Sequence, residues 1–197
     1  MNTFSTHRWA VLGALLLATA CTTTGKPAAS VPSAATIAEE NDAIRPVVEK
    51  LAVNVRELRV VYDDLHILAR GAISGADPDR QLDYVQKVYL YVNAALLVAE
   101  YQYKMLSVLN YVKDARRTDY LTLRARGLDE AISRMKETII FMTLYDAFII
   151  NPKVTATIAR TQALIQGNIY LYDQLLDILQ PLVHPAGAFT LDPYAPI

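Results

Sequence analysis

Few side chains in this sequence combine the residue types and spacing that support chemistry. Asp63 and His66 are the best-placed pair, because residues three apart share one face of a helix and both types bind metal ions. Glu100, Glu137 and Asp173 could add oxygen ligands, but no spacing in the sequence brings them to this pair. We therefore predict no metal ligands and no cofactor, and keep a metal centre as the weakest hypothesis.

Asp63-x-x-His66 loosely resembles the Glu-x-x-His element of ferritin-like di-iron bundles. Such sites need two of these elements and two further carboxylates that point into the bundle. The sequence offers no second element, since His184 lies beyond the predicted helices. His66 is therefore more simply explained as a partly exposed or hydrogen-bonded helix residue.

The sequence also lacks the motifs of nucleophilic catalysis and phosphate binding. Its single cysteine is Cys21, and it contains neither a Gly-x-Ser-x-Gly elbow nor a glycine-rich phosphate loop. His66 has no serine at a recognisable spacing. We predict that the protein is not an enzyme and assign no catalytic residues.

Tyrosine is the unusual residue of this chain, with 12 in all. Buried tyrosine hydroxyls need hydrogen-bond partners, and tyrosine is enriched at interface hot spots. Three interpretations stay open: filling of a wide core, a pocket for a small apolar or aromatic ligand, or a surface for a protein partner. The candidate residues are Tyr84, Tyr91, Tyr101, Tyr103, Tyr170 and Tyr172.

A basic cluster surrounds a predicted turn near residue 115. Its members are Lys113, Arg116, Arg117, Arg124 and Arg126. Cations near an anionic bilayer contribute about 1 kcal/mol each, so one hypothesis is that this turn faces lipid phosphates. The alternative is a solvated turn whose arginines pair with nearby acids such as Asp114 and Asp119.

The N-terminal segment closes on the only cysteine as Leu15-Leu16-Leu17-Ala18-Thr19-Ala20-Cys21. The apolar run that precedes it is shorter than the roughly 20 residues of a membrane-spanning helix. This arrangement resembles a bacterial lipoprotein signal with its lipobox. The resemblance implies that residues 1–20 are removed and that Cys21 becomes a lipidated N-terminus. Because Thr22 follows, rather than aspartate, it also implies anchoring at the periplasmic face of the outer membrane rather than in the inner membrane.

A plain cleaved signal, or an uncleaved anchor, is the alternative for this segment. Residues 21–35 are small, polar and interrupted by proline, a composition that predicts a flexible tether. A single cysteine excludes a disulfide framework, and a net charge of −1 gives no argument for nucleic acid.

From Thr36 onward the apolar residues recur at alternating steps of three and four, which predicts long amphipathic helices. Thr36 with Glu39 resembles a capping box, and Asp77 and Asn151 precede prolines as helix caps. The first predicted stripes are Ile37, Ile44, Val48, Leu51, Val55, Leu58, Tyr62, Leu65 and Ala69, then Leu82, Val85, Tyr89, Val92, Leu96, Ala99, Tyr103 and Leu106. The later ones are Leu121, Ala125, Leu128, Ile132, Met135, Ile139, Met142 and Ile149, then Val154, Ile158, Ile165, Tyr172, Leu175, Leu179 and Leu182.

Four such helices joined by short turns predict an all-α, up-down-up-down bundle over residues 36–183, with an irregular tail over 184–197. The leading functional hypothesis is a lipid-anchored, non-enzymatic scaffold or assembly factor for an envelope complex. Its partners would be the membrane, through the lipid anchor, and an envelope protein or further copies of the chain. A bundle that binds a small ligand among its tyrosines is the second hypothesis.

Overall fold

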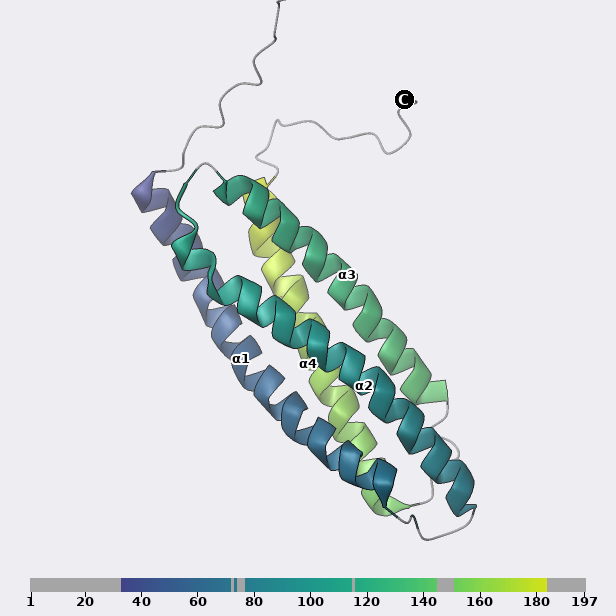
Figure 1. Cartoon of the computed structure of the whole chain (residues 1–197). Helices are drawn as coiled ribbons and strands as arrows, with labels where there is room; N and C mark the ends of the chain where they lie inside the picture. Colours follow the sequence, from purple (N-terminus) through teal and green to yellow (C-terminus); the bar gives the residue numbers. More distant parts are fainter. Residues whose placement is uncertain (1–32, 72, 74–76, 115, 145–150, 184–197) are drawn as a thin grey trace, which may run out of the picture. The chain divides into compact units, whose positions relative to one another are not determined.

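The computed structural model describes residues 33–71, 73, 77–114, 116–144 and 151–183. These residues form α1 (Ala34–Arg70), α2 (Pro78–Ser107), the short 3₁₀ helix η1 (Leu109–Tyr111), α3 (Arg117–Leu144) and α4 (Pro152–Val183), with no strand in this part of the chain (Figure 1). The predicted all-α bundle of four long helices is confirmed. The four described helices belong to one compact unit.

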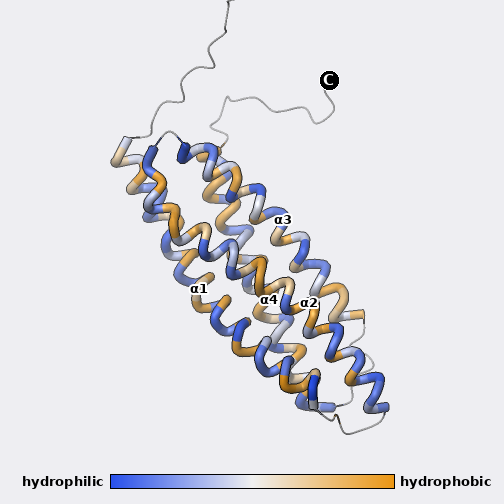
Figure 2. Tube along the Cα trace, in the orientation of Figure 1, coloured by the Kyte–Doolittle hydropathy of each residue, from blue (hydrophilic) through white to orange (hydrophobic). Residues whose placement is uncertain are grey.

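Each helix buries one stripe in a shared core. Core residues recur every seven positions, a spacing that keeps one seam of a helix facing its neighbours. They are Ile44, Leu51, Leu58 and Leu65 on α1, Val85, Val92, Ala99 and Leu106 on α2, Leu121, Leu128, Met135 and Met142 on α3, and Ile158, Ile165, Tyr172 and Leu179 on α4. All of them belong to the stripes predicted from the sequence. Hydrophobic and hydrophilic residues alternate along every helix in Figure 2, as expected of helices with one buried face.

Hydrogen bonds fix the direction of neighbouring helices. On the α1–α2 seam, Arg59 bonds Glu100 and Ala69 accepts from Gln86, so residue numbers rise on α1 as they fall on α2. The same opposite numbering holds for α2–α3, in the pairs Tyr84 with Met142 and Gln102 with Gly127. It also holds for α1–α4, where Asn54 bonds Leu164 and Glu57 approaches Arg160. These pairs of helices are antiparallel. α4 packs mainly on α3 and α1 and little on α2, so it lies diagonally opposite α2, and none of the four described helices is central to the bundle.

The first helix begins earlier than the sequence predicted. Ser33 is its N-cap, because the Ser33 hydroxyl accepts from the Thr36 backbone N–H at 3.1 Å. Thr36 therefore lies inside the first turn, and its predicted role as the cap is wrong. α1 starts two residues before the predicted boundary of the bundle, within the end of the predicted tether.

The other two predicted caps, Asn151 and Asp77, differ in whether their side chains form capping hydrogen bonds. Asn151 is confirmed, since its Oδ1 accepts from the backbone N–H groups of Lys153 (3.0 Å) and Val154 (3.3 Å). Asp77 does occupy the N-cap position before Pro78, in a left-handed conformation (φ 51°), but its carboxylate makes no capping hydrogen bond. Pro78 instead supplies a preset φ at the first helical position.

Two buried tyrosines, Tyr84 and Tyr172, differ in whether their hydroxyl groups form a hydrogen bond. Tyr84, 5% exposed, donates to the carbonyl oxygen of Met142 at 2.9 Å. Tyr172 is fully buried on α4, and its hydroxyl finds no hydrogen-bond partner among the described residues. Burial raises the pKa of Tyr172 well above the ordinary tyrosine value, because the anion would lose its hydration.

We expect Tyr172→Phe to leave the free energy of unfolding unchanged or to raise it by up to about 1 kcal/mol, because it removes an unsatisfied buried hydroxyl. Tyr84→Phe, the matched control, should lower it by about 1 kcal/mol, because it removes a made hydrogen bond. Urea unfolding at neutral pH measures both values. A Tyr172→Phe chain less stable than Tyr84→Phe would contradict this account.

Tyr172 also makes the free energy of unfolding depend on pH. The folded state disfavours the Tyr172 anion, so its contribution to stability is complete below the unfolded tyrosine pKa of about 10 and is lost as the pH rises above it. Tyr172→Phe should therefore flatten the alkaline fall in stability.

Candidate functional site

The predicted basic cluster does not form one exposed surface. Lys113, Arg116 and Arg126 are exposed, but Arg117 is fully buried and Arg124 is 4% exposed. The prediction that Arg117 and Arg124 face a membrane is therefore wrong. Both lie on the face of α3 that packs into the bundle, where helical periodicity places them in line with Leu121 and Leu128.

Arg117 ties three segments of the chain together. Its Nε donates to Glu40 (2.7 Å) and its Nη2 to the Asn41 side chain (2.9 Å), both on α1. Its Nη1 donates to the carbonyl oxygens of Leu109 (3.1 Å) and Val112 (2.8 Å), in the connection between α2 and α3. Four of the five N–H donors of the guanidinium are used within the protein, so Arg117 holds one end of the bundle together.

Arg124 is buried without such partners. Its Cζ lies 5.6 Å from the ring centre of Tyr101 and 5.3 Å from that of Tyr120, within the range of cation–π attraction. Its Nε and Nη1 are buried and make no hydrogen bond with any described residue. The Tyr120 hydroxyl is already used, since it donates to the Met105 carbonyl oxygen at 2.5 Å.

The exposed arginine of the turn is paired locally. Arg116 donates to Asp114 through Nε (2.9 Å) and Nη2 (2.6 Å), and its backbone N–H donates to the same carboxylate. These hydrogen bonds lower the pKa of Asp114 below the usual aspartate value. Arg116 thus behaves as the solvated alternative predicted, and only Lys113 and Arg126 lack a described ion pair among the exposed members of the cluster.

The six candidate tyrosines occupy different surroundings. Tyr84 and Tyr172 are buried, Tyr103 is partly buried, and Tyr91, Tyr101 and Tyr170 are 43%, 51% and 63% exposed. Tyr91 stacks on Phe141 with ring centres 4.1 Å apart, whereas Tyr170 only accepts a hydrogen bond from Gln174. They do not converge on one ligand pocket.

Sequence reasoning missed a hydrogen-bonded aromatic cluster that joins α1 and α2. The rings of Tyr62 and Tyr89 stack with centres 4.9 Å apart, and their hydroxyls lie 2.6 Å from each other. His66 Nδ1 lies 2.9 Å from the Tyr89 hydroxyl, and the hydrogen bond between the tyrosines raises the pKa of Tyr62. The four-residue step from Tyr62 to His66 was visible in the sequence, but the register that brings Tyr89 to them was not.

The hydrogen-bonded role of His66 agrees with the simpler interpretation of this residue. Glu100, one of the carboxylates considered for a metal site, instead pairs with Arg59. The described ranges contain no group of three His, Cys, Asp or Glu side chains placed to hold a metal ion.

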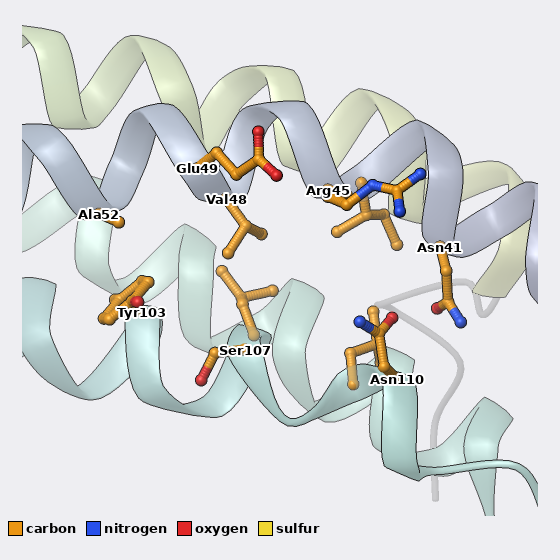
Figure 3. A pocket seen from close by; sticks show the side chains of 11 residues that line it. Asn41, Arg45, Val48, Glu49, Ala52, Tyr103, Ser107 and Asn110 are labelled. Carbon is orange, nitrogen blue, oxygen red and sulfur yellow. The ribbon is translucent and has the colours of Figure 1, made fainter.

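A groove lies between the first half of α1 and the end of α2 (Figure 3). Ile44, Val48 and Leu106 give it an apolar floor, and Tyr103 is the only candidate tyrosine that lines it. Its volume of about 190 Å³ is smaller than the roughly 300–1,000 Å³ of a typical small-molecule site. Asn41 on its rim already binds Arg117, and Arg45 pairs with Asp42, so few polar groups converge on the groove.

Cys21 lies outside the described residues, and so do the predicted signal peptide, most of the tether and the tail over 184–197. None of the described helices combines the length and apolarity that a membrane crossing requires. Comparisons with protein-family models, curated proteins and solved structures found no match.

We expect Arg117→Met to lower the free energy of unfolding by about 3–5 kcal/mol, because it leaves the Glu40 carboxylate and two carbonyl oxygens without their buried donor. Urea unfolding followed by circular dichroism measures the loss. Adding Glu40→Gln to this variant should recover part of it, since the uncompensated charge is removed.

The matched control is Arg116→Met, one residue earlier, where the side chain is exposed and the ion pair is local. This variant should unfold like the parent protein. Equal destabilisation by the two substitutions would show that Arg117 does not hold the segments together.

Proposed function

We propose that this protein is a lipid-anchored, non-enzymatic interaction factor at the periplasmic face of a bacterial outer membrane. The lipobox-like segment that ends at Cys21 supports the anchor and the location. A scaffold or assembly role is supported by the surface of the bundle, where a charge-poor face is left uncovered. A homo-oligomer or a complex with another envelope protein would bury this face.

The observation that carries the proposal is the composition of the surface shared by α1 and α4. Glu57 on α1 and Arg160 on α4 approach to 3.9 Å across the seam of these helices. Val53 and Val60 lie one turn to either side of Glu57, and Ala156 and Ala163 lie one turn to either side of Arg160, all exposed. Two turns beyond Val60 lies Ile67, 64% exposed, with the exposed Asp64 between them. Two turns beyond Ala163 lies Tyr170, 63% exposed, in the opposite direction because the helices are antiparallel. We call these six apolar residues the α1–α4 face.

The outer side of α4 contributes little charge to this face. Between Lys153 and Asp173 the helix carries only Arg160, and that charge has Glu57 as a partner. α4 packs on two neighbours, α3 and α1, and its residues Ala156, Ala163 and Tyr170 stay exposed, so burial inside the bundle does not explain this composition. A surface helix so poor in charge is typical of an interaction face.

A photo-crosslinking amino acid placed at Val60 or Ala163 tests the proposal in the native bacterium. We expect both positions to form the same discrete adduct with one protein, either another envelope protein or a second copy. The matched control is Ser133, an exposed helical position on α3, which should form none. Val60→Lys, at a site 48% exposed, should abolish the adduct formed from Ala163 without changing the stability of the bundle.

A result specific to the α1–α4 face would contradict the proposed interaction role. If positions 60 and 163 crosslink no more than position 133, or if Val60→Lys leaves the adduct from position 163 intact, the α1–α4 face is not an interaction surface.

A further inference from the structure

A second apolar stripe lies on the outer side of α2, next to its seam with α3. Its members are Leu90, Ala94, Leu97 and Tyr101, all exposed. They follow steps of four, three and four, which is the spacing of a contact stripe between helices. Since neighbouring helices pack in the order α1, α2, α3 and α4, and α4 packs on α1, the α2–α3 seam lies opposite the α1–α4 face.

α3 adds a row of two charged and two apolar side chains on its side of the seam. Leu123, Glu130, Arg134 and Phe141 follow steps of seven, four and seven, so they share one face of α3. Glu130 and Arg134 are exposed, and neither forms an ion pair with any described residue. We call this row, together with the stripe on α2, the α2–α3 face.

A hollow of about 280 Å³ lies between the two rows. The small residues Gly127 and Ala131 line it on α3, beside Glu130 and Arg134, and Leu97 and Tyr101 line it on α2. Its volume is below the roughly 300–1,000 Å³ of a typical small-molecule site. A shallow hollow beside protruding apolar side chains is instead typical of helix packing, in which a side chain of one surface enters a hole of the other.

The charges of the α2–α3 face favour a second copy of this chain as its partner. A symmetric dimer uses the same surface on both copies, so that surface must be complementary to itself. A two-fold axis across α3 at position 132, midway between Glu130 and Arg134, places each of them opposite the other residue in the second copy. The same axis places Leu123 opposite Phe141, because both lie nine residues from that midpoint.

The stripe on α2 is centred at the same height of the bundle. Its midpoint falls between Ala94 and Leu97. Two hydrogen bonds fix the register of the seam, Tyr84 with Met142 and Gln102 with Gly127, and interpolation between them sets this midpoint level with position 132 of α3. One axis perpendicular to the helices therefore serves both rows.

We propose that the α2–α3 face binds a second copy of this chain in an antiparallel, symmetric dimer. The α2 stripes pack against each other, with Leu90 of one copy opposite Tyr101 of the other at the edge of the hollow, and Glu130 pairs with Arg134 across the axis. The contact leaves the two α1–α4 faces on opposite outer sides of the dimer, so it does not depend on the proposed interaction with an envelope protein. Ser133 lies one turn beyond Asp129, on the α3–α4 side, and stays outside the contact.

Analytical ultracentrifugation of the chain without residues 1–21 tests the proposal. This chain keeps all four helices and lacks both the apolar N-terminal segment and Cys21, so neither the segment nor a lipid adds an association of its own. We expect a concentration-dependent equilibrium between monomer and dimer, with no larger species. Leu97→Asp should raise the dissociation constant of the dimer about a hundredfold or more, because it places a charge in the centre of the contact on both copies.

Exchanging the charges tests the register. Glu130→Arg and Arg134→Glu should each raise the dissociation constant about tenfold or more, because like charges then face each other twice in the symmetric contact. The double variant Glu130→Arg/Arg134→Glu restores opposite charges across the axis and should return the constant close to the parent value. Both positions are exposed, and circular dichroism checks that each variant stays folded.

The matched control is Val53→Asp, which places the same charge at a site of similar exposure, 51%, on the α1–α4 face. This variant should form the dimer like the parent chain. A parent chain that stays monomeric at every concentration would overturn the proposal, and the crosslinking test at positions 60 and 163 would remain valid. A double variant that fails to recover the dimer would also overturn it. So would loss of the dimer in Val53→Asp, which would place the second copy on the α1–α4 face.

Discussion

The bundle depends on one constraint: each helix must hide a single apolar stripe against its neighbours. Core residues spaced by seven meet this requirement on all four helices, from Ile44 to Leu65 on α1 and from Ile158 to Leu179 on α4. Burying a large aliphatic side chain contributes about 1.5–3 kcal/mol, so this seam outweighs any polar contact on the surface. Because the seam uses one stripe of each helix, the opposite sides stay outside the core, and their composition can serve another purpose.

Polar contacts then fix how the ends and the seams fit together. Arg117 joins the start of α1 to the connection between α2 and α3, and the cluster of Tyr62, Tyr89 and His66 joins the last turns of α1 to α2. Buried polar groups of this kind add little net stability when complete, but they are costly when a partner is removed. They therefore select one register among the several that the apolar seam alone would tolerate. Arg124 and Tyr172 show that the selection leaves some buried groups without partners.

The fold could be predicted from the sequence because a period of three to four is a local property. The four stripes, the Asn151 cap and the all-α architecture follow from residues close together in the chain. The surroundings of Arg117 and Arg124 could not be predicted in the same way. Five basic residues near a turn indicated a charged surface, although the helical phase of Arg117 and Arg124 relative to Leu121 and Leu128 was a signal in the sequence that these two point inward. The partners of Arg117 lie on α1 and in the connection between α2 and α3, so they depend on packing between segments. Packing between helices, which the sequence does not show, also explains why tyrosines close in sequence are divided among separate seams. The charge-poor composition of α4 was visible in the sequence, but only the packing shows which of its residues stay exposed.

The most direct test of the account is native mass spectrometry of the protein extracted from its own bacterial envelope. The account predicts a chain that begins at Cys21 with the added mass of a lipid, in a complex with another protein or with further copies of itself. A bare, unlipidated monomer that retains residues 1–20 would contradict the anchor. A lipidated monomer that carries only an extra mass of a few hundred daltons would contradict the interaction role and support a ligand-binding bundle instead.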